Sequence, residues 1–575
     1  MLNIKKNIDI AAGRKKAGVV LKNCKIVNVF SNKIVEGDIA IDGGKIIGIG
    51  DYEGKKEIDI EGKYVAPGLI DAHVHIESSL VSPCQFARAV VARGTTTVIA
   101  DPHEIANVCG LSGLGYMLNA TSNIPIDVFF MIPSCVPATS YENSGAVLSA
   151  KDIELMINHE RVLGLGEVMN YPAVINAERD IINKIKIAKT HNKIIDGHGP
   201  VISGKELNAY MVSGIKTDHE CANETEMIDR LERGMYIAIR EGTAAKNLEV
   251  LIKAVTPENE RRCMFCTDDR HPEDIINSGH IDNNVRLAIK CGTDPIAAIR
   301  MATLNTAECY KLENLGAIAP GYNADVIVFD SFKDFNIEKV FKHGKLVVEK
   351  GKVMFDGTPV NGDKVENTVN FKKIDKSDLE MHLKTGIVNV IRVLPRSLIT
   401  EKTVRRVDLD NKGLFKPHKD LDIVKLAVIE RHNATGNIGL ALVENFQLKN
   451  GAIASTVAHD SHNIIVIGDN DGDIMVAINE LKRAEGGITL CSQGEVLKTL
   501  ELPIAGLISK LSMKEVVEIL EEMLDLAYNK LNVNREIDPF MTLSFLALPV
   551  IPDIKLTDLG LFDVSSFKLI DINVD

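Results

Sequence analysis

Between about residues 66 and 310, short apolar runs alternate with stretches of helical spacing. The runs include T-T-T-V-I-A-D, V-L-G-L-G-E-V and C-M-F-C-T-D-D. Strands that alternate with helices in this way build a parallel sheet, because each crossover helix returns the chain to the same edge. A length of roughly 250 residues suits a closed barrel of eight such units. The expected fold class is therefore α/β, with a TIM-like (β/α)8 barrel over 66–311.

Two β-rich stretches flank the predicted barrel. Residues 17–65 contain several short strand-like runs, and Asp42-Gly43 between alternating apolar residues is a hairpin signal. Short strands return near 324–330 and 343–353. We expect both stretches to join in one small composite β-sandwich domain, made of 1–65 plus 312–365.

Residues 370–575 predict a further C-terminal α/β domain. Ser512-Met513-Lys514-Glu515 has the pattern of a capping box that opens a helix through roughly residue 531. Apolar residues recur along it at helical spacing and predict a core face: Val516, Val517, Leu520, Met523, Leu524, Ala527, Tyr528 and Leu531.

Composition limits the partners. A formal charge of −13 argues against a nucleic-acid backbone as partner. No apolar run reaches the ~20 residues that span a bilayer, and the N-terminus lacks a signal-peptide core. Ten cysteines are scattered without a framework spacing, which favours the cytoplasm. Cys263 and Cys266 form a lone C-x-x-C and are expected to be buried strand residues.

His73 and His75 stand two apart at the end of the apolar run V-A-P-G-L-I-D. Residues i and i+2 of a strand point to one face, so both imidazoles leave the strand in the same direction. Converging neutral imidazoles are half of a transition-metal site. By themselves, they could equally be loop histidines satisfied by hydrogen bonds.

Four more ligand-type residues follow later predicted strands, which strengthens the metal interpretation. They are Glu167, His198, His219 and Asp268. Barrel enzymes place their catalytic groups at such strand ends. Six ligands exceed the needs of one tetrahedral ion and suit two ions.

Carboxylate oxygens can bind separate cations, so Glu167 is the expected bridge between the ions. His73, His75 and Asp268 would complete one ion, and His198 with His219 the other. Two neighbouring ions stabilise hydroxide at neutral pH, and Asp268 is a candidate acceptor for its proton.

Longer motifs extend the pattern of strand-end ligands. The H-x-H and the late T-D are followed by M-A-T-L-N-T-A-E (301–308) and by the run from 315 to 330, where the chain re-enters the predicted β-sandwich. Together these features resemble the amidohydrolase superfamily. Further unusual segments are G-L-I-D-A-H-V-H-I-E-S-S, A-D-P-H-E-I-A-N-V-C-G, S-T-V-A-H-D-S-H-N-I-I-V-I-G and L-P-I-A-G-L-I-S. In these segments the chain resembles the bacterial-type adenine deaminases of that superfamily.

The resemblance implies hydrolysis of adenine to hypoxanthine and ammonia, a purine-salvage reaction, at two divalent ions. Manganese or iron is expected, with zinc as a further option. The family's ligands correspond to His73, His75, Glu167, His198, His219 and Asp268, with Glu167 in place of the carbamylated lysine of many relatives. Family habit also suggests a homodimer.

Further residues are expected to take part in the reaction. His103 and Glu104 are candidates for proton transfer, and Asp101 for holding the purine edge; the alternative is a helix N-cap and first turn. Asp269 and His271 would line the pocket or be solvated loop residues. His462, with His459 and Asp460, belongs to a lid over the substrate or to a domain interface.

Other functions fit less well. The zinc nucleobase deaminases need H-x-E with P-C-x-x-C, which is missing after Pro83-Cys84. A cyclic amidase that opens hydantoin or dihydropyrimidine rings would share the metals and differ in its pocket. A non-enzymatic scaffold of the same fold would bind no transition metal. A nucleic-acid editor is disfavoured by the acidic balance.

Overall fold

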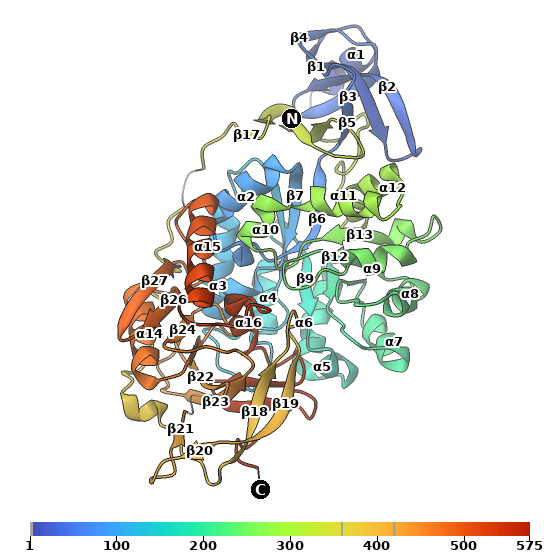
Figure 1. Ribbon diagram of the computed structural model, residues 1–575. Coiled ribbons are helices and arrows are strands. Elements are labelled where there is room, and N and C mark those ends of the chain that lie inside the picture. The colour runs from blue at the N-terminus through green and yellow to red at the C-terminus, as the bar shows by residue number, and fades with distance from the viewer. Residues whose placement is uncertain (1–3, 358–359, 418–420, 575) are drawn as a thin grey trace.

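The computed structural model describes residues 4–357, 360–417 and 421–574. The ends of two expected domains, at residues 1–3 and 575, lie outside the described residues, as do 358–359 and 418–420. A barrel occupies the centre of Figure 1, with a small β-rich unit above it and the C-terminal region at the lower left. Among the described residues, no helix is both long and apolar enough to cross a membrane.

The central barrel contains eight parallel strands. They pair in two sheets, with the orders β10-β9-β8-β7-β6 and β11-β12-β13. Backbone hydrogen bonds close both seams: Asp268 donates to His73 at 3.0 Å, and Lys216 donates to Ile195 at 3.1 Å. The expected (β/α)8 barrel is confirmed. The strands are β6 (Leu69–Val74), β7 (Thr95–Ala100), β8 (Asp127–Ile132), β9 (Val162–Val168), β10 (Ile194–Gly197), β11 (Thr217–Asp218), β12 (Tyr236–Arg240) and β13 (Cys263–Cys266).

These strands read as nearly continuous apolar runs because both of their faces are covered, one by helices and one by the barrel interior. Cys263 and Cys266 are buried, unpaired residues of β13, as predicted. The surrounding helices are α2 (Pro83–Ala92), α3 (His103–Ala120), α4 (Ala150–Met156), α5 (Tyr171–Ile175), α6 (Arg179–Thr190), α7 (Gly204–Val212), α8 (Glu224–Glu232), α9 (Leu248–Leu251), α10 (Pro272–Asn277), α11 (Ile281–Lys290), α12 (Pro295–Met301) and α13 (Leu304–Cys309).

One mixed sheet joins the β-rich stretches on either side of the barrel. β5 pairs antiparallel with β14, so that Pro67 lies opposite Val326. The turn between β2 and β3 contains Gly43 and Gly44, both at positive φ, as a two-residue hairpin requires. The strands are β1 (Ala17–Asn28), β2 (Lys33–Asp42), β3 (Lys45–Gly50), β4 (Gly54–Asp59), β5 (Tyr64–Pro67), β14 (Val326–Phe329), β15 (Ile337–Lys342), β16 (Lys345–Glu349) and β17 (Lys352–Val353); helix α1 (Ile4–Ala11) precedes them.

The boundaries expected at residues 65, 311, 365 and 370 stay predictions. β5 continues past residue 65 to Pro67 within the small sheet.

The C-terminal region is built on a second large sheet, in the order β19-β18-β23-β22-β25-β24-β26-β27. Its strands are β18 (Ile387–Val393), β19 (Thr400–Arg406), β22 (Ile423–Ile429), β23 (Ile438–Glu444), β24 (Ala452–Ser455), β25 (Ile464–Gly468), β26 (Gly487–Ser492) and β27 (Glu495–Glu501). Smaller pairings are formed by β20 (Asp408–Leu409) with β21 (Phe415–Lys416), and by β28 (Ile554–Thr557), β29 (Gly560–Asp563) and β30 (Lys568–Leu569).

The described part of this region also contains the α-helices α14 (Asp471–Arg483), α15 (Met513–Asn529) and α16 (Pro539–Phe545). The predicted capping box is present, because Ser512 and Glu515 exchange hydrogen bonds at the start of α15. The apolar face of α15 is buried or partly buried along its length, as expected.

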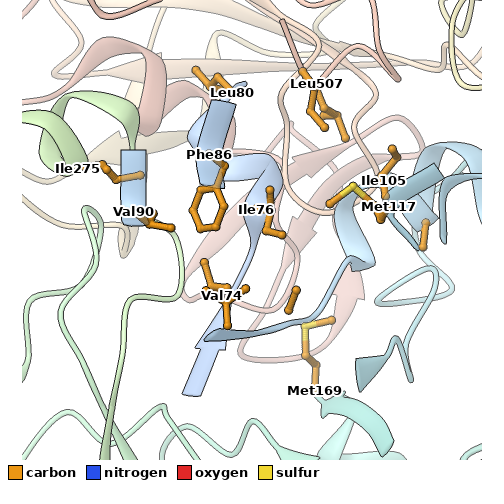
Figure 2. Close-up of a cluster of buried hydrophobic side chains, with 14 of the residues drawn as sticks. Val74, Ile76, Leu80, Phe86, Val90, Ile105, Met117, Met169, Ile275 and Leu507 are labelled. Carbon is orange, nitrogen blue, oxygen red and sulfur yellow. The ribbon is translucent and has the colours of Figure 1, made fainter. Parts of the chain in front are cut away.

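The C-terminal region packs directly on the segment that follows β6. Ser509 donates a backbone hydrogen bond to Leu80 at 2.8 Å. Figure 2 shows Ile76 and Leu80 of this segment, Ile105 and Met117 of α3, and Leu507 of the C-terminal region within one buried cluster. The segment after the first two predicted ligands is therefore fixed from both sides.

Candidate metal centre and adjoining cavity

His73 and His75 project from the end of β6 toward Asp268. Their Nε2 atoms lie 3.2 Å apart, and His75 Nε2 is 3.1 Å from Asp268 Oδ1. His75 Nδ1 faces the carbonyl oxygen of Asp101 at 2.8 Å, so its proton sits on Nδ1 and Nε2 is free to bind a cation. The three side chains form one convergent donor group.

Glu167, near the end of β9, lies between this group and the other two histidines. Its Oε1 is 3.3 Å from His75 Nε2, while its Oε2 is 2.6 Å from His198 Nδ1 and 3.3 Å from His219 Nε2. Burial alone would raise the pKa of Glu167, but His103, His198 and His219 together hold it well below its usual range. The two oxygens thus face two different sets of donors.

The region around His198 and His219 contains a carboxylate that the sequence analysis missed. Glu220 Oε1 is 3.9 Å from His198 Nδ1 and 3.7 Å from His219 Nε2. Glu220 directly follows His219 in T-D-H-E, and that adjacency was the available signal. The three side chains form a second donor group.

Asp268 follows β13 in a left-handed conformation, with φ of +56°, which is uncommon for residues other than glycine. Arg240, at the end of β12, donates to Asp268 Oδ2 at 2.8 Å and also binds Glu220. Burial alone would raise the pKa of Asp268, but Arg240 with His73 and His75 keeps it well below its usual range. Asp268 is therefore an ionised, oriented carboxylate. Arg240 was not predicted.

Asp101 orients two of the predicted ligands, Glu167 and His75, through hydrogen bonds. Its Oδ2 accepts a hydrogen bond from Glu167 N–H at 2.9 Å, and its backbone carbonyl orients His75. Gly166 permits this approach, because a Cβ there would lie 2.1 Å from Asp101 Oδ2. The helix N-cap alternative does not describe Asp101, since α3 begins at His103 with Pro102 at the N-cap.

The first turn of α3 carries His103 and Glu104 toward the centre. His103 Nδ1 is 3.1 Å from Glu167 Oε1, and His103 Nε2 is 3.4 Å from Glu104 Oε1. Asp460 of the C-terminal region, expected in a lid or at a domain interface, approaches His103 Nε2 to 3.9 Å through its Oδ1 atom. Both His103 and Glu104 are buried.

Both oxygens of Glu104 are engaged by histidines of the C-terminal region. Oε1 lies 2.5 Å from His459 Nδ1, and Oε2 is bonded to His462 Nε2. His462 Nδ1 accepts the backbone N–H of Ala458 at 3.1 Å, so its own proton is on Nε2 and is donated to Glu104. This tautomer makes His462 a hydrogen-bond donor there.

The charges of this trio follow from its contacts. Burial opposes the charged forms, but the Glu104 carboxylate raises the pKa of His459 to about 9. The histidines in turn hold the pKa of Glu104 well below its usual range against the effect of burial. Burial lowers the pKa of His462 to about 4. A charged His459–Glu104 pair with a neutral His462 results.

A cavity adjoins the centre between the barrel and the C-terminal region, and Glu104, His459 and His462 line it. His271 lines it as well, with Nδ1 3.6 Å from Glu273 Oε1. Among the described residues, Asp101 and Asp269 are not part of its lining. Asp269 Oδ1 accepts from Ser78 Oγ, which does line it, at 2.5 Å. Apolar side chains complete the walls: Leu80, Val457, Ile488, Leu507, Leu520, Leu524, Phe540 and Met541.

The donor set fits divalent cations. Glu167 Oε1, His219 Nε2 and His103 Nδ1 are buried without a hydrogen-bond partner, although such atoms normally have one. Several imidazole nitrogens also point at one another or at carboxylates within 4.8 Å. Imidazole and carboxylate donors together suit manganese, iron and zinc. These orphaned atoms are satisfied if cations lie between them.

A barrel with imidazole and carboxylate donors at its strand ends defines a metal-dependent hydrolase of the amidohydrolase type. Residues 64–347 match the amidohydrolase family model, and residues 397–568 match the model of the adenine deaminase C-terminal domain.

An adenine deaminase of Clostridium acetobutylicum is 57% identical over 99% of this chain and 100% of its own length. An adenine deaminase 2 of Carboxydothermus hydrogenoformans is 50% identical over the full length of both chains. Among solved structures, an enamidase matches with a TM-score of 0.45 and 20% identity over 58% of this chain and 96% of its own. The chain belongs to the adenine deaminase family.

Proposed function

We propose that the protein hydrolyses adenine to hypoxanthine and ammonia. The observation that carries the proposal is that His73, His75, His198 and His219 surround the two oxygens of Glu167, while Asp268 lies beside His73 and His75. The full-length similarity to adenine deaminases supports adenine as the substrate.

Two divalent ions would be held by His73, His75, Glu167, His198, His219 and Asp268, and the two oxygens of Glu167 face different donor groups. When bound, such ions lower the pKa of water, which makes hydroxide available at neutral pH. We propose Mn²⁺ or Fe²⁺, with Zn²⁺ as the alternative, because the mixed donors accept all three.

In the reaction, a C6–O bond forms and the C6–N bond of the exocyclic amine breaks. One proton of the attacking water ends on ring N1 and the other on the departing ammonia. Asp268 is proposed as the base, because Arg240 keeps it ionised and oriented beside His73 and His75.

The transfer of protons to ring N1 and to the departing amine is proposed for His103 and Glu104. His103 lies between Glu167 and Glu104, and Glu104 reaches both the cavity and the charged His459. His459 can therefore restore a proton to this side of the site.

We further propose that His462 and His271 border the purine, since both line the cavity. Asp269 would orient Ser78 at the cavity by accepting its hydroxyl hydrogen bond. Asp101 would orient Glu167 by accepting a hydrogen bond from its backbone N–H. A cytoplasmic homodimer is proposed as well, and the free, mostly buried cysteines are consistent with a reducing compartment.

The test is metal analysis of the purified full-length protein, followed by ammonia assays with adenine, adenosine, cytosine and a hydantoin. Metal-loaded protein should release ammonia from adenine, and Asp268→Ala should abolish it while the protein stays folded. Asp525→Ala, on the exposed face of α15, is the matched control and should retain wild-type turnover. Ring opening of the hydantoin without turnover of adenine would assign the site to a cyclic amidase.

A further inference from the structure

Two buried glutamates lie side by side at the start of α3, and only one of them has a proposed role. Glu104 takes part in the site described above. Glu77, two residues after His75, lies beside it, because Glu77 Oε1 accepts a hydrogen bond from the backbone N–H of Ile105 at 3.2 Å. Both carboxyl groups line the cavity.

Glu77 has an unused acceptor. Glu77 is 3% exposed, and its Oε2 atom is buried without a hydrogen-bond partner. Leaving a buried polar atom unpaired is costly, and such atoms in native proteins usually meet a ligand or ordered water. A ligand in this cavity would supply the missing donor.

The other polar groups at this end of the cavity are already paired. Glu104 uses both oxygens for His459 and His462, and Ser78 donates its hydroxyl to Asp269. Glu273 is the other lining acid with an unpaired oxygen, but its side chain is 27% exposed. Glu77 is thus the deeply buried acceptor that the cavity leaves open.

The cavity that Glu77 lines has apolar walls. Leu80, Val457 and Leu507 are apolar lining residues, while Glu104 connects the cavity through His103 to Glu167. A planar base between such walls would present its edge atoms to the polar end. Apolar walls with a few placed polar groups are typical of small-ligand sites.

We propose that Glu77 recognises the unsubstituted imidazole edge of the purine by accepting its ring N–H, and so selects the free base over nucleosides. A free purine base carries this N–H on N7 or N9. A purine substituted at N9 has no imidazole N–H in its neutral form. The inference depends on the proposed function, since it assigns the substrate edge within the same site.

Glu77→Gln is the informative variant, because it keeps size and shape. The Ile105 N–H requires an acceptor, so the amide oxygen takes the place of Oε1 and the NH₂ group takes the place of Oε2. The variant therefore turns the free acceptor into a donor. A donor repels the N–H of adenine, but it can bind the lone pair of N7 in 9-methyladenine.

The experiment measures KM and kcat for adenine and the inhibition constant of 9-methyladenine, with Mn²⁺-loaded full-length protein. We expect Glu77→Gln to raise KM for adenine by about 10- to 100-fold, the loss of one hydrogen bond to a carboxylate. The value of kcat should change by less than ~3-fold, because the lost contact is shared by ground and transition states. The inhibition constant of 9-methyladenine should stay the same or fall.

Glu515→Gln, at the surface cap of α15, is the matched control and should leave all three constants unchanged. Metal content and circular dichroism of Glu77→Gln should equal those of the wild type. Calorimetry should show that the wild type binds hypoxanthine more tightly than 9-methylhypoxanthine. Glu77→Gln should reverse this order, and the measurement requires no turnover.

Failure of the two proposals is distinguishable. If metal-loaded wild type releases no ammonia from adenine, the proposed function fails, and calorimetry alone then decides on Glu77. If the wild type is active but Glu77→Gln keeps its KM and its preference, the role of Glu77 is overturned. The same holds if Glu273→Gln reverses the preference instead.

Discussion

Glu104 and His459 form a charged pair at 2.5 Å, although 355 residues of sequence separate them. One belongs to the first turn of a barrel helix and the other to the C-terminal region. Both are buried, and Glu104 also accepts from His462. The C-terminal region therefore contributes directly to the wall of the barrel's candidate site.

His459→Ala should destabilise the protein by about 3–5 kcal/mol, because the Glu104 charge stays buried with one partner fewer. Urea unfolding followed by fluorescence and circular dichroism measures the loss. In a Glu104→Gln background, the same substitution should cost much less, since no charge is left uncompensated. Equal costs in both backgrounds would show that the pair is not coupled.

Gly166→Ala should reduce kcat by roughly 100-fold, the size of effect that an ångström-scale displacement of catalytic groups produces. The added methyl group would lie 2.1 Å from Asp101 Oδ2 and would push Asp101 from its bond with Glu167. Steady-state ammonia release measures the effect.

Gly115→Ala in α3 is the matched control, because a Cβ there meets nothing within 4 Å. It should keep full activity and stabilise the helix by about 0.5–1 kcal/mol. Loss of activity in this variant as well would mean that glycine replacement acts through general unfolding.

Stability should depend on pH through Lys555 of β28. Burial lowers the pKa of Lys555 to about 7, while an unfolded lysine titrates near ~10.4. Between these values the unfolded state binds one more proton, so the free energy of unfolding rises with pH by about 1.4 kcal/mol per unit. Below pH 7 both states are protonated, and the effect of Lys555 is constant.

Lys555→Met should remove this contribution. The test is urea unfolding of wild type and variant at pH 7, 8, 9 and 10. The difference between their free energies of unfolding should change by about 1.4 kcal/mol per pH unit. Parallel curves would contradict the assignment.

Ser512→Ala should weaken the start of α15 by about 1 kcal/mol, because the helix loses the side-chain acceptor for Glu515 N–H. Thermal unfolding measures the change. Ser512→Asp keeps an acceptor and should restore most of the loss. Since Leu520 and Leu524 of this helix line the cavity, binding of hypoxanthine reports whether its wall is disturbed.

The barrel was predictable because its buried strands carry apolar runs that end in chemically distinctive residues. His73, Glu167 and Asp268 could each be placed at a strand end, and the structure brings these ends together. The sequence could not indicate that Arg240 links Asp268 to Glu220. That contact depends on the neighbour relations of β12 and β13 rather than on any local pattern.

The hydrogen-bond partners of Glu104 could not be predicted from the sequence for a different reason. The sequence H-D-S-H at 459–462 predicts either a lid or an interface, and choosing between them requires knowing how the C-terminal region packs on α3. His459 and His462 line the cavity and bind Glu104 of the barrel, so they lie where the C-terminal region meets the barrel; the lid stays a prediction.

The pairing of β5 with β14 has a consequence for synthesis on the ribosome. Pro67 meets Val326 only after the intervening chain has emerged, which takes tens of seconds at ~5–20 residues per second. Until then, one edge of the N-terminal sheet is open to strand addition by other chains. A nascent chain that stalls within the barrel would thus carry an unprotected edge, and we expect chaperones to engage it there.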